Sequence, residues 1–268
     1  MRVFLELSYD GTHYHGWQRQ PECTTVQEVL EGAMERLFGQ PFSVMGCGRT
    51  DTGVHARYFV AHTVIDDDVF HGRVSSMQEA TMKLNGMLPK DIGLKAMHQV
   101  GAKAHARFDA VERSYAYHVH SSKDPFLEGK STRIFGELNL EAMQEAAAHL
   151  VQKGDFASFC KAGTGQGTTI CDVREARWEQ IGPHQWAFHI SADRFLRNMV
   201  RAVVGTLLEV GRGKRTPESM ADVLAAAHRS AAGKSVLGCG LYLTKVIYPP
   251  EVFSPSDEGY LRVMATQG

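Results

Sequence analysis

The first hundred residues contain stretches in which apolar and polar positions alternate, the pattern of a strand with one buried face. Residues 3–9 show it most clearly, because Val3, Leu5, Leu7 and Tyr9 alternate with polar or less apolar positions, and this predicts a half-buried strand. Further strands are predicted at 42–47, 57–65 and 92–100.

Two segments between these strands have apolar residues three and four positions apart, which predicts helices. The first follows Thr25 and Glu28, which have the spacing of a capping box, and Gly39 is expected to end it. The second covers 76–85 and begins with Ser76 and Glu79, another capping box. The first hundred residues therefore read β-α-β-β-α-β.

The second half of the chain resembles the first in outline. Strands are predicted at 113–120, 170–179, 185–192 and 240–248, and helices at 140–151, 194–210 and 216–228. Because strands and helices do not alternate strictly, the sequence predicts an α+β fold with mainly antiparallel sheets rather than a doubly wound parallel sheet. We expect two ferredoxin-like α/β-sandwich halves, 1–104 and 105–250, followed by a tail at 251–268.

Composition narrows the class of protein. Hydrophobic residues make up 43% of the 268 and charged residues 22%, as in ordinary globular proteins, and no apolar run reaches the roughly 18 residues that span a bilayer. The N-terminal segment does not have the pattern of a signal peptide. Five scattered cysteines without a CxxC pair predict reduced thiols in a cytoplasm, neither a disulfide framework nor a zinc site.

The formal net charge is −1, which by itself does not indicate a nucleic-acid-binding protein. Binding to a polyanion requires only a local basic surface, however, so the arrangement of the 29 Lys and Arg residues in space decides the question.

The segment GCGRTDTGVHA, residues 46–56, places Arg49 and Asp51 two positions apart in a glycine-rich stretch. Either the two form an ion pair that ties down a turn, or Asp51 is presented for chemistry by a loop without bulky neighbours. Asp51-Thr52-Gly53 is also the tripeptide of aspartic proteases, but those enzymes need two such carboxylates and this chain has one DTG.

Arg194, Arg197 and Arg201 lie in DRFLRNMVRAVVG, 193–205, at the spacing of one helix face, with Asn198 beside them. Three arginines on one face repel each other unless they meet phosphates or a buried carboxylate, or unless the face is simply solvated. Tyr115 and Tyr117 share one face of a predicted strand, either as core packing or as a floor on which a nucleobase stacks.

Taken together, ordered segments along nearly the whole chain resemble the tRNA pseudouridine synthase A family. They are YDGTHYHGWQRQ (9–20), VQEVLEGAM (26–34), GRTDTGVHA (48–56), NGMLPKDI (85–92), HARFDAVERSYAYHV (105–119), GDFASF (154–159), FLRNMVRAVVG (195–205) and GLYLTKVIYP (240–249). The resemblance implies conversion of uridine to pseudouridine in the anticodon stem-loop of tRNA, at positions 38, 39 and 40. It also implies a homodimer, two halves around a central cleft, and no cofactor or metal.

The resemblance assigns roles by position. Asp51 corresponds to the catalytic aspartate, Tyr115 to the tyrosine over the target base, and Arg201 to the arginine that pairs with the aspartate. Arg49 corresponds to the arginine near the flipped nucleotide, and Arg194 and Arg197 are expected to contact RNA phosphates.

The chain departs from the family pattern at two places. Thr52 stands where alanine is commoner, and Asp193-Arg194 stands where Asn-Gly is frequent. Whether Asp51 would act as a nucleophile or remove a sugar proton is open at this stage. A non-catalytic RNA-binding protein on the same fold is the alternative function.

Overall fold

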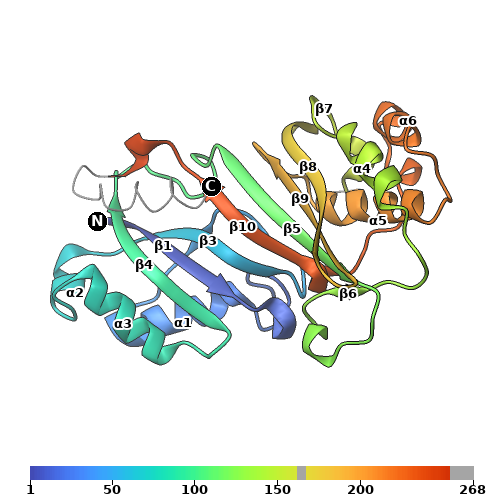
Figure 1. Ribbon diagram of the computed structural model, residues 1–268. Helices are drawn as coiled ribbons and strands as arrows, with labels where there is room; N and C mark the ends of the chain where they lie inside the picture. The colour runs from blue at the N-terminus through green and yellow to red at the C-terminus, as the bar shows by residue number, and fades with distance from the viewer. Residues whose placement is uncertain (162–166, 254–268) are drawn as a thin grey trace. The chain divides into compact units, whose positions relative to one another are not determined.

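The computed structural model describes residues 1–161 and 167–253. Two compact units divide the chain (Figure 1): Met1–Val111 with the segment that starts at Thr244, and Glu112–Leu243. The expected boundary after residue 104 falls inside the first unit, and the expected tail lies outside the described residues from 254 on. The organisation into two ferredoxin-like halves stays a prediction.

The first unit contains an antiparallel sheet covered by helices on one face (Figure 1). Strand β1 (Arg2–Tyr9) lies between β3 (His55–Val64) and β4 (Ile92–Val100), and β2 (Met45–Gly46) pairs with β3. The helices are α1 (Val26–Phe38), α2 (Asp67–His71) and α3 (Met77–Met87). This order of elements is the predicted β-α-β-β-α-β, with the short α2 added.

The helix ends in this unit confirm the capping predictions. Thr25 accepts the Glu28 N–H before α1, and Gly39 ends that helix with φ 75°. Ser76 accepts the Glu79 N–H before α3, while the Glu79 carboxylate accepts from Ser75. Helix α2 was missed because its five residues are too short to show a periodicity, although Asp66 caps it.

Strand β1 is buried on both faces in its middle, which corrects the half-buried prediction. Val3, Leu5 and Leu7 are fully buried on one face, and Phe4 on the opposite face is only 1% exposed. Phe4 packs against Tyr248 and Phe253, with ring centroids 5.2 and 6.1 Å away. The apolar partners come from the segment after Thr244, which the local pattern of residues 3–9 does not reveal.

The strands of the second unit pair antiparallel in the order β5 (Glu112–His120), β9 (Gln185–Ala192), β8 (Ile170–Gly182) and β7 (Lys153–Asp155). The two-residue strand β6 (Thr132–Arg133) runs parallel to the end of β5. Helices α4 (Leu140–Ala148) and α5 (Met199–Gly211) lie beside these strands, and α6 (Ser219–Ala226) contacts α4 (Figure 1). Strand β10 (Leu241–Ile247) begins in the second unit and ends in the first.

Short 3-10 helices connect these elements, at Gly11–His13, Pro125–Leu127, Ala157–Phe159, Arg229–Ala231, Gly238–Gly240 and Pro250–Val252. The predicted fold class, α+β with mainly antiparallel sheets, is confirmed.

The start of helix α5 differs from the prediction. The sequence predicts a helix from 194, but α5 begins at Met199 because Asn198 has a left-handed backbone with φ 67°. A residue in this conformation interrupts the helical hydrogen-bond ladder, so residues 194–198 form an extended entry and a turn.

Candidate functional site

Asp51 lies on the turn between β2 and β3 in the first unit, where it is half-buried, while Arg49 is exposed. The residue before it is firmly held: the Tyr9 hydroxyl and Thr50 Oγ1 are 2.8 Å apart in a buried hydrogen bond. The Trp17 N–H also donates to the Thr50 carbonyl at 3.1 Å. The backbone immediately before Asp51 is therefore held in place at Thr50.

The residues after Asp51 are held as well. The Val54 N–H donates to the Asp51 carbonyl at 3.1 Å, and the Gly53 N–H donates to the Tyr14 carbonyl at 3.2 Å. His55 is 2% exposed and its Nδ1 accepts the Gly11 N–H at 3.0 Å. Hydrogen bonds on both sides thus fix the backbone that presents the Asp51 carboxylate.

The loop 10–17 supplies most of these contacts, and two of its glycines are required by close approach. A Cβ on Gly11 would lie 2.0 Å from the Val54 carbonyl oxygen. A Cβ on Gly16, which has φ 92°, would lie 2.4 Å from the Thr50 carbonyl oxygen. The sequence analysis predicted no function for this loop, although Gly11 and Gly16 could have indicated that its backbone packs closely against another segment.

Tyr115 and Tyr117 lie on β5 in the second unit and differ in burial. Tyr117 is 0% exposed, and its hydroxyl contacts Thr132 Oγ1 at 2.6 Å and donates to the Leu237 carbonyl at 2.8 Å. Burial raises the pKa of Tyr117, so its hydroxyl remains a donor. Tyr117 is therefore a core residue, and a stacking floor built from both tyrosines is wrong.

Tyr115, in contrast, is half-buried, and its ring meets that of Phe195 edge to face with centroids 5.0 Å apart. Phe195 belongs to the extended entry before α5. This contact fixes the Tyr115 ring without covering it completely.

Arg201 lies in the first turn of α5 and is half-buried. Its Nε donates to the Val236 carbonyl at 2.7 Å, and the Val236 N–H donates back to the Arg201 carbonyl at 3.1 Å. These reciprocal bonds fix both the direction of the guanidinium and the segment around Val236.

Arg194 and Arg197 do not share a helix face with Arg201, because they precede the helix. Arg197 is exposed and Arg194 is half-buried. The argument that three arginines repel each other on one helix face is therefore wrong. Asp193 has a structural role, since its Oδ1 accepts the N–H groups of Arg194 and Asp172 at 2.7 and 2.8 Å.

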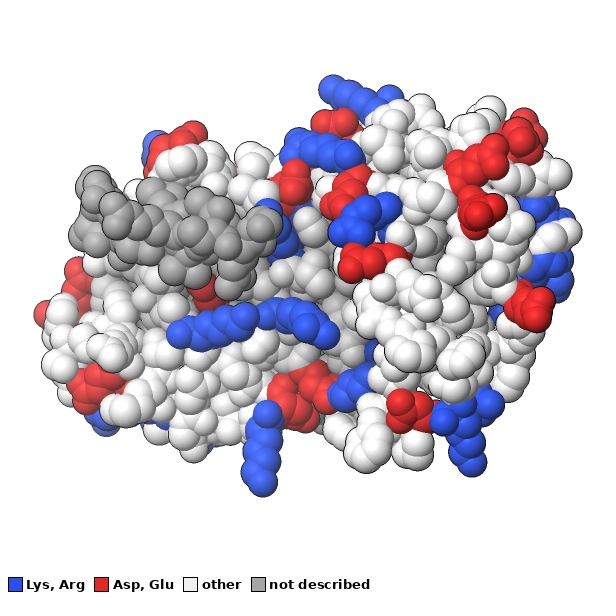
Figure 2. Space-filling model, viewed as in Figure 1, with Lys and Arg blue, Asp and Glu red and all other residues white. Residues whose placement is uncertain are grey.

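The charge distribution agrees with the near-neutral composition. On the face shown in Figure 2, acidic and basic side chains are interspersed rather than gathered in one basic patch. On β8, Arg174 pairs with Glu112 at 2.7 Å, and Arg177 pairs with both Glu175 and Glu179 at 2.7 Å. These cations are already paired with carboxylates.

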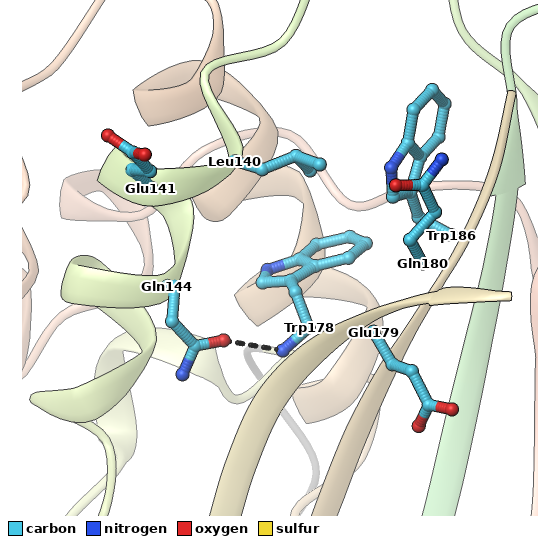
Figure 3. A pocket seen from close by; sticks show the side chains of 7 residues that line it. All are labelled: Leu140, Glu141, Gln144, Trp178, Glu179, Gln180 and Trp186. Carbon is cyan, nitrogen blue, oxygen red and sulfur yellow. Dashed lines mark hydrogen bonds between the residues drawn. The ribbon is translucent and has the colours of Figure 1, made fainter.

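A pocket of about 380 Å³ lies in the second unit beside α4, β8 and β9 (Figure 3). It is lined by Leu140, Glu141, Gln144, Trp178, Glu179, Gln180 and Trp186. Figure 3 shows Leu140 and the two indole rings facing this space, while both carboxylates point away from Trp178. Within the described residues, the indole nitrogens of Trp178 and Trp186 are buried without a hydrogen-bond partner. None of the site residues predicted from the sequence lines this pocket.

No helix in the described ranges is long and apolar enough to cross a membrane. No group of three or more His, Cys, Asp or Glu residues in them is arranged to hold a metal ion.

Comparison with known proteins gives consistent matches. The chain matches the family described as tRNA pseudouridine synthase over residues 7–109 and 146–249. A protein named tRNA pseudouridine synthase A from Porphyromonas gingivalis is 45% identical over 94% of this chain and 99% of its own length. Proteins of the same name from Bacteroides thetaiotaomicron and Geobacter sulfurreducens are 46% and 41% identical, over 94% and 91% of this chain and 93% and 98% of their own. Because the matched ranges include both the Asp51 turn and helix α5, the chain belongs to the tRNA pseudouridine synthase family.

Proposed function

We propose that this protein isomerises uridine to pseudouridine in tRNA, in the anticodon stem-loop at positions 38, 39 and 40. The observation that carries the proposal is the Asp51 turn: a half-buried carboxylate on a backbone held on both sides, inside a matched family range. A carboxylate held this way needs little rearrangement before it reacts.

The reaction requires one bond to break and one to form. The bond between sugar C1′ and base N1 breaks, the base turns, and C5 joins C1′; C5 then loses a proton and N1 gains one. We assign Asp51 the central step, either as a nucleophile toward the sugar or base or as a base that removes a sugar proton. Both routes require the carboxylate to be ionised.

The other predicted residues receive roles around the uridine. The target base must leave the helical stack, which costs a few kcal/mol, and Arg49 would hold the extruded nucleotide. Tyr115, which is half-buried and whose ring contacts Phe195, would stack on the uracil. Arg201 is the proposed ion-pair partner of the catalytic carboxylate, and Arg194 and Arg197 would contact phosphates.

We further propose that the enzyme acts in the cytoplasm as a homodimer and uses no cofactor. The chemistry supports the last point, since isomerisation of uridine exchanges only protons and leaves the oxidation state unchanged. Free thiols at all five cysteines are consistent with a reducing compartment.

Tritium release from tRNA labelled at uridine C5 tests the function. We expect the purified protein to release tritium from a bulk tRNA pool, with pseudouridine mapped to positions 38–40. A protein that binds tRNA but releases no tritium would instead be the non-catalytic RNA-binding alternative.

A further inference from the structure

Asp91, at the end of the loop before β4, contacts the loop 10–17 twice. Its Oδ1 accepts the Tyr14 hydroxyl at 2.7 Å, and its backbone carbonyl accepts the Asp10 N–H at 2.9 Å. Within the same loop, the Tyr14 N–H donates to the Gly11 carbonyl at 3.0 Å. One residue, Asp91, therefore holds both ends of the turn 10–14.

This turn is the part of the loop that contacts the chain just after Asp51. The Tyr14 carbonyl accepts the Gly53 N–H at 3.2 Å, and the Gly11 N–H donates to buried His55. Gly11 also packs directly on the Val54 carbonyl. Asp91 is thus connected to Gly53, two residues beyond Asp51, through the single residue Tyr14.

The Tyr14 hydroxyl is not needed to fill the core. Tyr14 is 5% exposed, and a phenylalanine ring would occupy the same space. The hydroxyl adds a bond to a carboxylate, which is stronger and more directional than one between neutral groups. Burial and the neighbouring Asp91 raise the pKa of Tyr14, so the hydroxyl keeps its proton and remains the donor.

We propose that Tyr14 and Asp91 are positioning residues that hold the Asp51 turn in its reactive geometry. The inference rests on the proposed function of Asp51 and extends it to a pair 77 residues apart in sequence. Loss of the Tyr14–Asp91 hydrogen bond, here called the clamp, keeps Asp51 in the chain but lets its turn shift. A displacement of about 1 Å can lower a rate about 100-fold.

Single-turnover tritium release with Tyr14→Phe and Asp91→Ala tests the clamp. We expect each variant to lower the rate at saturating tRNA by roughly ten- to 100-fold while the Kd for tRNA changes less than about twofold. The double variant should be no slower than either single variant, because both remove the same contact. Asp91→Asn keeps an acceptor oxygen and should restore part of the rate lost in Asp91→Ala.

Tyr248→Phe is the matched control. The Tyr248 hydroxyl donates to the Ala106 carbonyl at 2.5 Å in the same unit, Tyr248 is similarly buried, and this acceptor lies outside the loop 10–17. We expect its rate to stay within about twofold of wild type at a comparable loss of stability. A wild-type rate for Tyr14→Phe, or an equal rate loss for Tyr248→Phe, would overturn the proposal.

Amide hydrogen exchange separates the clamp from the proposed function. In Tyr14→Phe the Gly53 and Gly11 N–H groups should exchange faster, whereas the N–H groups of α1 should not. If the wild-type protein releases no tritium, the proposed function fails; unchanged exchange at Gly53 would reject the clamp in either case.

Discussion

Gly16 shows at the scale of one residue how the loop 10–17 constrains the Asp51 turn. Its φ of 92° is strained for any side chain, and a Cβ there would overlap the backbone carbonyl of Thr50. Thr50 cannot move away easily, because it is also hydrogen-bonded to Tyr9 and Trp17.

We therefore expect Gly16→Ala to lower the free energy of unfolding by about 2–4 kcal/mol and to reduce turnover with it. Urea unfolding and single-turnover assays measure the two effects. Gly86→Ala is the control, since nothing lies within 4 Å of a Cβ at that position in α3, and alanine there should be neutral or stabilising. Equal stability of the two variants would contradict the close approach of the loop 10–17 to the backbone at Thr50.

The environment of His62 predicts that the free energy of unfolding depends on pH. Its Nδ1 accepts the Ala106 N–H at 3.1 Å, and burial, together with the charges of His105 and Arg2, lowers the pKa of His62 to about 4. Asp109 acts in the opposite direction. Between pH 6.5 and 4 the unfolded chain binds a proton at this position that the folded chain does not, so the free energy of unfolding falls as the pH falls.

His62→Asn keeps an acceptor for the Ala106 N–H but cannot titrate. Between pH 7 and 4, we expect the free energy of unfolding of His62→Asn to fall by about 2 kcal/mol less than that of the wild type. Parallel curves for wild type and His62→Asn would show that His62 does not contribute.

At the scale of elements, the beginning of α5 is set by Asn198 rather than by the apolar pattern. Asn198 has a left-handed backbone, and its Nδ2 donates to Ser235 Oγ at 2.6 Å. Asparagine tolerates this conformation better than most residues other than glycine.

The order of stability of two substitutions at Asn198, to alanine and to glycine, distinguishes this turn from a continuous helix. We expect Asn198→Ala to destabilise the protein by about 1–3 kcal/mol and Asn198→Gly to cost less, because glycine accepts the left-handed backbone. In a continuous helix alanine would be the better of the two by about 1 kcal/mol. Urea denaturation of the two variants gives the order.

The elements predicted most accurately are those whose signals are local. The capping residues Thr25 and Ser76 lie within three positions of their partners, so sequence alone located α1 and α3 closely. The start of α5 was misplaced because a helical spacing of side chains does not report a left-handed residue. The double burial of β1 was missed because Phe4 is covered by Tyr248 and Phe253, far along the chain.

The residues of the candidate site likewise divide into those with a local sequence signal and those that depend on distant contacts. Asp51 was singled out by its glycine-rich segment and by family resemblance, and its catalytic role stays a prediction. Tyr14 and Asp91 carried no local signal, because the hydrogen bond between them joins positions 77 apart. The different environments of Tyr115 and Tyr117 depend on contacts with Phe195, Thr132 and Leu237, which strand periodicity cannot show.

At the scale of the whole molecule, a net charge of −1 must be reconciled with binding to tRNA. On the face shown in Figure 2 the charges are interspersed, and Arg174 and Arg177 on β8 are paired with carboxylates, so we expect RNA binding to depend on a local group of cations rather than on overall charge. Exposed Arg197 and half-buried Arg194 are the candidates named by the sequence.

Neutralising either candidate should therefore change the salt dependence of tRNA binding. We expect Arg194→Gln and Arg197→Gln each to reduce the slope of log K against log salt concentration by about one unit. Arg177→Gln should leave the slope unchanged, since Glu175 and Glu179 already neutralise that guanidinium. Unchanged slopes for the first two variants would remove them from the RNA contact.

The most direct measurement for the account as a whole is single-turnover pseudouridine formation by Asp51→Asn, which preserves the shape of the side chain but removes its charge and basicity. Asp68→Asn, at an exposed position of helix α2, controls for the loss of one negative charge. We predict that Asp51→Asn binds tRNA within about threefold of wild type and releases C5 tritium at least about 1,000-fold more slowly, as expected when an essential catalytic group is lost. A rate within about tenfold of wild type would contradict the assignment of Asp51 as the catalytic residue.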